Sequence, residues 1–362
     1  MERKENMKRI TLKEIGKQLN LSPGTISKAL NDSHEISAET KKMILAYTQK
    51  INYIPNFSAK SLKTGRSNTL AIIVPFISSS FFFDFYEEIS LILSQTNYQL
   101  ILLQTFNDEK KEKEALELCV QSNIDGIIIS PVKNDSSLSL LMYIMEQICP
   151  IIIFDRINHQ LDTFKIGIQN NKVIYQATEE MIKNGRKNII LLLCKDIGGN
   201  TSRIKGYKDA LFNCSIPYNE QNIVEISYSS PKDDIDEELE RKISSLLSNP
   251  IPPDALLSTT DTLSLKVLYI LNKLAVKIPE NMNLIGFSNT PFANSLNPSL
   301  TTITQPTRLM ADRSVELLLE MLKNRNKKNY FEFETYFLDC KIEHRKSTSV
   351  FREQVAIFFK PI

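Results

Sequence analysis

The sequence predicts two folds in one chain: an all-α helix-turn-helix domain at the N-terminus and a larger α/β body made of two successive units. Residues 11–66 show helix caps and the helical spacing of apolar residues. From Thr69 onward, short apolar runs alternate with amphipathic stretches, which is typical of parallel sheets covered by helices on both faces. The charge divides at the same place, because the first segment is basic and the remainder is mildly acidic.

The first predicted helix begins at Thr11. Residues 11–14 (Thr-Leu-Lys-Glu) form a capping box, in which the Thr11 hydroxyl accepts from the amide of Glu14 and Glu14 reaches back to the Thr11 amide. Apolar residues then recur at i, i+3 and i+7 as far as Leu19, so one face of this helix is apolar.

A tight turn and a second short helix follow. Ser22 is a good N-cap, and Pro23 suits the first helical position because its missing N–H is no loss there. The predicted buried face of this helix consists of Ile26, Ala29 and Leu30. Thr25, Ser27 and Lys28 are left pointing outward. Two short helices joined in this way are the helix-turn-helix pattern.

A third helix, capped by Ser37 and running to about Ile51, could close a small core with the first two. The alternative is a three-helix bundle with no role in nucleic-acid binding. Charge argues against that alternative: residues 1–66 hold thirteen Lys/Arg and six Asp/Glu, a balance of +7, whereas the whole chain is +2. A basic head on a body of −5 is the pattern expected when the head binds phosphates.

These motifs resemble the lactose/galactose repressor family. The residues that carry the resemblance occur in order at 10–15 (ITLKEI), 21–31 (LSPGTISKALN), 53–56 (YIPN) and 61–67 (SLKTGRS). The resemblance implies a ligand-responsive, sequence-specific regulator of transcription, expected to be a repressor, that binds double-stranded operator DNA as a homodimer. It places the DNA contacts at Thr11, Ser22, Pro23, Gly24, Thr25, Ser27, Lys28, Asn31, Asn56, Ala59, Lys60, Leu62 and Lys63.

Residues 56–63 are expected to form a hinge helix. Alone, such a segment is unstable, because isolated helices shorter than about 12 residues are marginal. In the resembled family this helix folds on operator DNA, and a leucine at the position of Leu62 wedges into the minor groove. The alternative for Leu62 is a buried linker leucine.

The recognition helix departs from a typical reading surface. Its first two outward positions are Pro23 and Gly24, and neither has a side chain that can hydrogen-bond to a base edge. We therefore expect direct readout to be sparse, and specificity to depend on Lys28 and on the base step opened by Leu62.

The body is predicted to contain strands and helices in alternation. The predicted strands are Leu70–Val74, Gln99–Leu103, Gly126–Ser130, Ile151–Phe154, Ile189–Leu193, Ala255–Ser258, Leu284–Phe287 and Phe331–Leu338. The predicted helices are 82–95, 110–122, 171–184, 203–213, 233–247, 262–273 and 307–323.

By the resemblance, the body has a periplasmic-binding-protein-like fold of two Rossmann-like subdomains. One takes residues 68–166 with a return near 304–330, and the other takes 167–300 plus the last strands. A ligand would lie in the cleft, outside the carboxyl ends of the strands.

Residues that follow the predicted strands are the candidates for effector binding: Phe81, Phe82, Ser130, Asp155, Arg203, Asp261, Ser288 and Gln305. Arg203 matches the effector-binding arginine of the resembled family. Aromatic rings for stacking and polar groups for hydroxyls suit a sugar or a similar small metabolite. The alternatives are that Asp261 only caps a helix, that Arg203 pairs with a surface acid, and that the phenylalanines belong to the core or a dimer interface.

One candidate departs from the family pattern. The family often has Gly-(Tyr/Phe)-Asp where residues 286–288 are Gly-Phe-Ser, so a carboxylate that commonly holds a ligand hydroxyl is absent. We therefore do not expect this chain to have the same sugar specificity as family members that carry this carboxylate.

Composition argues against other classes of protein. No apolar run approaches the roughly 18–20 residues that span a bilayer, and residues 1–9 lack the apolar core of a signal peptide. We expect a cytoplasmic bacterial protein, associated with the nucleoid when bound to its operator. The competing interpretation is an enzyme or a transport-type sugar binder with an accidental basic head.

Catalytic and metal chemistry have little to be built from. The five cysteines are scattered and never at metal-ligand spacing, and the three histidines are far apart. The sequence also shows no Gly-rich phosphate loop. We therefore expect no metal, no cofactor and no enzymatic activity.

The chain divides into four expected parts. These are a helix-turn-helix domain (1–54), a hinge helix and linker (55–67), an effector-binding and dimerisation domain (68–345) and a C-terminal appendage (346–362). The appendage has no heptad run, so a dimer rather than a tetramer is expected.

Overall fold

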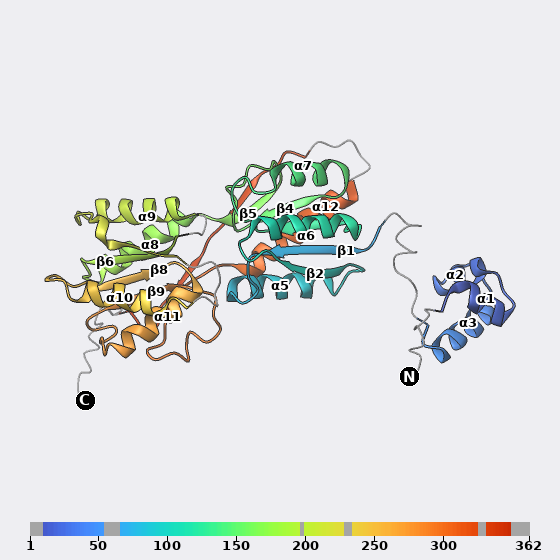
Figure 1. The fold of residues 1–362 in the computed structure, drawn as a ribbon, viewed down its shortest axis with the longest axis horizontal. Helices are drawn as coiled ribbons and strands as arrows, with labels where there is room; N and C mark the ends of the chain where they lie inside the picture. The colour runs from blue at the N-terminus through green and yellow to red at the C-terminus, as the bar shows by residue number, and fades with distance from the viewer. Residues whose placement is uncertain (1–9, 54–65, 196–198, 228–233, 325–330, 349–362) are drawn as a thin grey trace, which may run out of the picture. The chain divides into compact units, whose positions relative to one another are not determined.

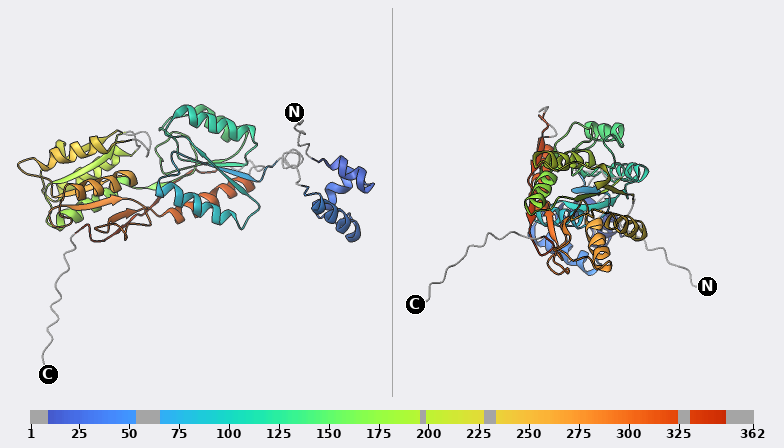
Figure 2. Two further views of the ribbon diagram at one scale, coloured as in Figure 1. Left: turned by 60° about the horizontal axis from the view of Figure 1, so that its bottom comes forward. Right: turned by 90° about the vertical axis from the view of Figure 1, so that its left-hand side faces the viewer.

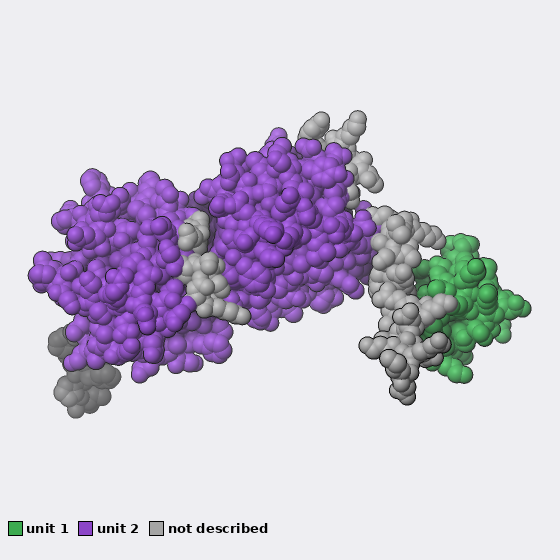
Figure 3. All heavy atoms as spheres, in the orientation of Figure 1, with its two compact units in different colours: residues 1–64 green, residues 65–362 purple. Residues whose placement is uncertain are grey.

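The computed structural model describes residues 10–53, 66–195, 199–227, 234–324 and 331–348. The chain forms two compact units, residues 1–64 and residues 65–362 (Figure 3). The predicted hinge segment lies outside the described residues, together with five expected DNA contacts: Asn56, Ala59, Lys60, Leu62 and Lys63.

The first unit is the predicted three-helix domain. Its helices are α1 (Leu12–Leu19), α2 (Pro23–Leu30) and α3 (Ala38–Lys50) (Figure 1). The capping box is confirmed: the Thr11 amide donates to Glu14 Oε2 at 2.8 Å, and the Glu14 amide donates to Thr11 Oγ1 at 3.3 Å. The predicted caps of the other two helices are also confirmed. The buried core consists of Ile15, Ile26, Ala29 and Ile44.

The second unit contains two six-stranded sheets. The first has the order β11-β5-β4-β3-β1-β2 and is parallel throughout. Its strands are β1 (Thr69–Val74), β2 (Gln99–Gln104), β3 (Gly126–Ile129), β4 (Ile151–Phe154), β5 (Lys165–Ile168) and β11 (Thr335–Leu338). One face packs against α5 (Ser80–Leu93) and α12 (Thr307–Asn324), the other against α6 (Glu109–Gln121) and α7 (Leu138–Gln147).

The second sheet has the order β12-β10-β9-β8-β6-β7. Its strands are β6 (Ile189–Cys194), β7 (Ile223–Ile226), β8 (Ala255–Ser258), β9 (Asn283–Phe287), β10 (Thr301–Thr304) and β12 (Lys341–Glu343), of which β12 is antiparallel to β10. The 3-10 turn η1 (Glu220–Asn222) precedes β7. Helices α8 (Asn170–Lys183) and α9 (Asn200–Asn213) cover one face, and α10 (Asp236–Leu247) and α11 (Asp261–Lys273) cover the other.

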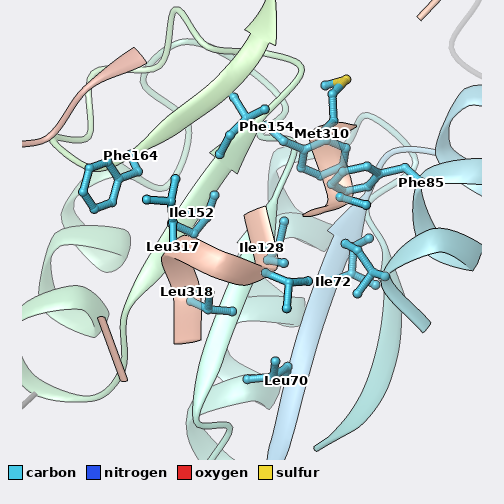
Figure 4. Close-up of a cluster of buried hydrophobic side chains, with 14 of the residues drawn as sticks. Leu70, Ile72, Phe85, Ile128, Ile152, Phe154, Phe164, Met310, Leu317 and Leu318 are labelled. Atoms are coloured by element: carbon cyan, nitrogen blue, oxygen red, sulfur yellow. The ribbon is translucent and has the colours of Figure 1, made fainter. Parts of the chain in front are cut away.

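Figure 2 shows both sheets from two further sides, with helices on each face. Apolar side chains from strands and helices fill the space between these layers. Figure 4 shows this for the first sheet, where Ile72, Ile128 and Ile152 of neighbouring strands lie together and Leu318 of α12 lies beside them. Burial of these side chains on both faces explains the near-continuous apolar runs of the strands.

The predicted division of the body was wrong in one place. The strand β11, expected in the second subdomain, lies in the first sheet and pairs in parallel with β5. It is held there in part by aromatic contacts just before it, since Phe331 and Phe333 pack on Phe164. The first segment of the first subdomain ends with β5 at Ile168, close to the expected boundary at about residue 166.

The boundary expected after Arg345 falls too early. The Ser347 side chain is buried, accepts from the Thr301 amide at 2.8 Å and donates to the Leu284 carbonyl at 2.6 Å. Thr348 is buried as well. The folded body therefore continues at least to Thr348.

The chain passes between the two sheets three times. It leaves the first sheet after β5, returns after β10 to form α12 and β11, and enters the second sheet again as β12. Each subdomain is consequently built from segments that lie far apart in the sequence.

Candidate functional site

The helix-turn-helix of the first unit depends on a close backbone approach. Asn20 ends α1 in the left-handed region (φ 57°), and the Leu21 amide donates to the Gly16 carbonyl at 2.9 Å. A Cβ on Gly16 would lie 2.5 Å from the Leu21 carbonyl oxygen. Only glycine therefore lets the turn fold back on α1 and set the angle of α2.

The outer side of α2 is polar and accessible. Of the expected DNA contacts in the described residues, Thr11, Ser22, Pro23, Gly24, Lys28 and Asn31 are exposed, and Thr25 and Ser27 are half-buried. Two of these polar groups also hold the helix, since the Ser22 hydroxyl accepts from the Thr25 amide at 3.0 Å and Asn31 Nδ2 donates to the Ser27 carbonyl at 2.8 Å. These hydrogen bonds fix the shape of a surface that is polar and accessible.

Lys28, the charged residue of this surface, forms an ion pair with Glu35. The two side chains are 48% and 53% exposed. Such exposed pairs stabilise a protein by only about 0–1 kcal/mol, so a DNA phosphate or a guanine edge can replace the carboxylate at small cost.

The second unit contains a cavity of about 1040 Å³ between its two subdomains. Loops that follow β2, β3, β4 and β6 contribute to it, with the first turns of α8 and α9 and with Phe337 of β11. Carboxyl ends of parallel strands meet at such a place, where open α/β sheets bind ligands. Two of the eight candidate effector residues, Asp155 and Arg203, line this cavity.

Asp155 reaches the cavity from the end of β4. Its backbone is in the left-handed region (φ 62°), which aspartate tolerates better than most residues, and its amide donates to the Ile166 carbonyl at 2.9 Å. The Ser130 hydroxyl donates to Asp155 Oδ2 at 3.1 Å. Burial raises the pKa of the Asp155 carboxyl, and the nearby Arg156 and Arg203 oppose that rise.

The neighbouring Arg156 supports the loops of the first subdomain. Its guanidinium donates to the carbonyl oxygens of Pro131 (3.0 Å) and Val132 (2.9 Å). It also donates to Asn107 Oδ1 at 2.7 Å, and its Nε lies 4.0 Å from Asp155 Oδ2. Arg156 thereby ties the ends of β2, β3 and β4 into one wall of the cavity.

Arg203 belongs to the opposite wall. Its side chain is buried, its Nε donates to Asn170 Oδ1 at 3.1 Å, and its guanidinium lies 5.3 Å from the centre of the Phe287 ring. The close packing of α9 on α8 makes this possible, because a Cβ on Gly206 would lie only 2.1 Å from the Asn171 carbonyl oxygen. A carboxylate from one subdomain and a guanidinium from the other thus line the same cavity.

The remaining candidates lie elsewhere. Ser130 is buried behind Asp155, and Phe81 and Phe82 pack in the hydrophobic core of the first subdomain. The rings of Phe81 and Phe82 contact the ring of Phe154, which belongs to strand β4. None of the three lines the cavity.

Asp261, Ser288 and Gln305 belong to a separate polar network. The Ser288 hydroxyl donates to Asp261 Oδ1, and the Asn289 amide donates to the same oxygen at 3.2 Å. The Gln305 amide donates to Asn289 Oδ1 at 2.9 Å. The alternative that Asp261 only caps a helix is wrong, because Thr260 caps α11.

This network joins the two subdomains. The hydroxyl of Ser79, at the start of α5, donates to Asp261 Oδ2 at 3.0 Å instead of capping its own helix. Burial raises the pKa of the Asp261 carboxyl, and its hydrogen-bond donors oppose that rise. Burial also raises the pKa of Asp84, on α5, to about 6, and the charge of Asp261 adds to the rise.

Several cavity residues were missed by the sequence analysis: Asn107, Asn134, Asn158, Asn170, Lys195 and Phe337. Most of them follow a strand within a few residues, so a wider search of the strand ends would have found Asn107 and Lys195. Phe337 carries no such signal, because its strand lies in a sheet that the sequence did not predict for it.

An exposed helix-turn-helix in a basic head, combined with a polar cavity between two α/β subdomains, defines a DNA-binding regulator that responds to a ligand. The model of bacterial regulatory proteins of the lacI family matches residues 11–56, and the periplasmic binding protein-like domain matches residues 178–348. This chain belongs to the LacI family of transcriptional regulators.

Individual relatives agree over nearly the whole chain. The "Probable HTH-type transcriptional regulator EndR" of Paenibacillus polymyxa is 28% identical over 93% of this chain and 98% of its own length. The lac repressor dimer bound to operator and the anti-inducer ONPF shares the fold, with a TM-score of 0.78 at 20% identity over 95% of this chain and all of that one. A periplasmic binding protein/LacI transcriptional regulator of Alkaliphilus metalliredigens, complexed with D-xylulofuranose, is 25% identical with a TM-score of 0.65 over 78% of this chain and all of that one.

In the described residues, none of the helices is both long and apolar enough to cross a membrane. No group of three or more His, Cys, Asp or Glu side chains in that part of the chain is arranged to hold a metal ion.

Proposed function

We propose that this regulator binds operator DNA through α2 and the linker. Its affinity for the operator falls or rises when a sugar-like metabolite binds in the cavity between its subdomains. One observation carries the proposal: Asp155 and Arg203, from different subdomains, line the same cavity. A polyhydroxylated ligand that bridges them would favour one relative pose of the subdomains, and differential affinity of that kind is what couples two sites. The sugar bound by the Alkaliphilus relative supports this class of ligand.

The proposed DNA contacts are those expected from the sequence, with Lys28 as the charged one on α2. We propose that the chain forms a homodimer and that exposed apolar side chains on α5 (Phe83, Leu91) and α11 (Leu265, Tyr269) contribute to its interface, because an interface would remove their apolar surface from water. Light scattering should then report twice the 41.4 kDa chain mass. We further propose a cytoplasmic location and no enzymatic activity. The free thiols of all five cysteines suit a reducing compartment.

The DNA-binding half of the proposal is tested by fluorescence anisotropy on a pool of duplexes at several salt concentrations. Affinity should fall steeply with salt, because phosphate contacts release counterions. Lys28→Gln should lower the salt slope by about 1 if Lys28 contacts a phosphate, or cost about 1–3 kcal/mol on selected sequences if it contacts a base. Lys110→Gln, on the exposed face of α6, is the control and should change neither quantity. Salt-independent affinity, or equal behaviour of the two variants, would refute this assignment.

The ligand-binding half is tested by a thermal-shift screen of sugars and sugar phosphates. A ligand at one hundred times its Kd stabilises the folded body by about 2.7 kcal/mol. Arg203→Gln should lose this stabilisation while keeping salt-dependent DNA binding in the absence of ligand. A ligand response that survives in Arg203→Gln would place the effector outside this cavity.

A further inference from the structure

The two walls of the cavity differ in charge. Among the described lining residues, the wall from the second subdomain has no acidic side chain and three cations: Lys195, Arg203 and Lys205. The wall from the first subdomain is balanced, with two cations and two acids: Lys133, Arg156, Asp135 and Asp155. Among the described lining residues, a net positive charge is therefore found on the second wall and not on the first.

The charge on the second wall is only partly matched by its surroundings. Lys205 pairs with Asp209 one turn further along α9, at 2.5 Å. Lys195 follows β6 directly, is exposed, and makes no ion pair with any described residue. Arg203, in contrast, is buried and held in place by Asn170 and the Phe287 ring. The second wall thus presents two cationic groups to a ligand: the guanidinium of Arg203, which is fixed in place, and the ammonium of Lys195, which ends a long, flexible side chain.

Two helix ends add to the positive potential of this wall. The first turns of α8 and α9, each a helix of 14 residues, both line the cavity, and neither has a side-chain cap. They adjoin, because a Cβ on Gly199 would lie 3.1 Å from Asn170 Nδ2. The partial positive charge of each N-terminus, roughly half an elementary charge, therefore faces the same space as the cations.

We propose that the effector of this regulator carries an anionic group, a phosphate or a carboxylate, which binds to the second wall through Lys195 and Arg203. This inference rests on the proposed role of the cavity as the effector site. The planar guanidinium suits two oxygens of such a group, and the ammonium adds a point charge. The hydroxylated remainder of the ligand faces the balanced wall, where Asp155 accepts hydrogen bonds and Phe337 offers a ring.

The probe for this inference is inorganic phosphate acting on the full-length protein. The melting temperature of the body is measured in phosphate and in chloride at equal ionic strength, so that general screening cancels. We expect phosphate to raise it and Lys195→Gln to remove about half of the phosphate-specific rise, since one of two direct charge contacts is lost. Lys187→Gln, an exposed lysine of the same subdomain outside the cavity, should keep the whole rise.

Two results would overturn the inference. One is a melting temperature in phosphate no higher than that in chloride, and the other is an equal loss of the phosphate-specific rise in Lys195→Gln and Lys187→Gln. Both lysines are exposed, so far-UV circular dichroism should show folded variants. Salt-dependent DNA binding of the same preparation reports the proposed function separately. A protein that binds DNA but ignores phosphate contradicts the anionic effector alone.

A second arm distinguishes the source of the charge. Glucose, gluconate and glucose 6-phosphate are each added, and the difference in melting temperature between phosphate and chloride is measured again. A compound that displaces phosphate from the cavity abolishes this difference. Displacement of phosphate by the sugar phosphate alone indicates a phosphorylated effector, and displacement by gluconate alone indicates a sugar acid. Displacement by glucose as effectively as by both anions would contradict an anionic requirement.

Discussion

At the scale of single residues, two glycines decide where the functional elements lie. Gly16 lets the turn after α1 approach the helix, and Gly206 lets α9 approach the start of α8. In both places the space that a Cβ would need is occupied by a backbone carbonyl, which cannot rotate away as a side chain can. The recognition helix and the cavity arginine both depend on such an approach.

Gly16→Ala should destabilise the head by about 1–3 kcal/mol, because the added methyl overlaps the Leu21 carbonyl. Gly24→Ala is the matched change in the next helix, where a Cβ would lie 3.6 Å from Ser22 Oγ, an ordinary contact. It should stabilise the head by up to about 1 kcal/mol through helix propensity. Amide hydrogen exchange of Ile15 and Ile26 in the full chain measures both effects. Equal protection in the two variants would contradict this account of the turn.

The two candidate residues that do line the cavity were marked by different signals: Arg203 by the family resemblance and Asp155 by its place at a strand end. Asp155 directly follows the apolar run of β4, and it does line the cavity. Phe81 and Phe82 carried no signal that separates a pocket from a core, because consecutive aromatic residues on a helix suit either. Three-dimensional packing against Phe154 decides that they are core residues.

At the scale of elements, segments with a continuous apolar run or a clear helical period were predicted closely. The helix expected over 171–184 is α8, at Asn170–Lys183, and the strand expected at Ile151–Phe154 is β4. The four missed strands, β5, β7, β10 and β12, are as short as β4, but their apolar runs are interrupted by charged residues, glycine or threonine. Helix α7 was also missed, and the sheet to which β11 belongs depends on distant partners that no local pattern contains.

Helix α12, which was predicted from the sequence, stabilises the body by packing against the first sheet. Leu318 is fully buried against the first sheet, where its side chain fills the space above Gly126. Leu318→Ala should therefore destabilise the body by about 2–5 kcal/mol, the usual cost of a cavity in a packed core. Glu320→Ala, on the exposed side of the same helix, should change stability by less than about 0.5 kcal/mol. Chemical denaturation followed by circular dichroism separates the two, and similar midpoints would contradict the packing of α12.

At the scale of the body, its subdomains are held together by the polar network around Asp261 as well as by the crossing chain. Ser79, which precedes α5, and Asp84 on α5 belong to the first subdomain, whereas Asp261 and Asn289 belong to the second. A buried carboxylate between two subdomains makes their association sensitive to its charge and to that of its neighbours.

The pKa of Asp84 predicts the direction of this sensitivity. It rises from an ordinary 3.8 to about 6, mainly through burial, with further contributions from Asp261, Glu87 and Glu88. Because the folded body holds the proton more tightly than the unfolded chain, this group should favour folding below about pH 4 and lose that contribution as the pH rises to about 6.

Asp84→Asn should flatten the stability profile over that range. It should also raise stability at neutral pH by about 1 kcal/mol, a value reduced for solvent screening of a half-exposed group. Glu146→Gln, exposed on α7 of the same subdomain and not among the charges that raise the pKa of Asp84, is the control. Urea denaturation at a series of pH values is the measurement, and an unchanged profile in Asp84→Asn would contradict the assignment.

The triple passage of the chain has a consequence for synthesis on the ribosome. The first subdomain begins at Thr69, yet it lacks its covering helix α12 and its edge strand β11 until translation has passed Leu338. Domains that are complete at the N-terminus fold as they emerge, but in this one the sheet face that α5 and α12 share stays partly uncovered until α12 is made. Products of premature termination would therefore carry a finished head on an aggregation-prone body, and proteolysis should remove them before they occupy any operator.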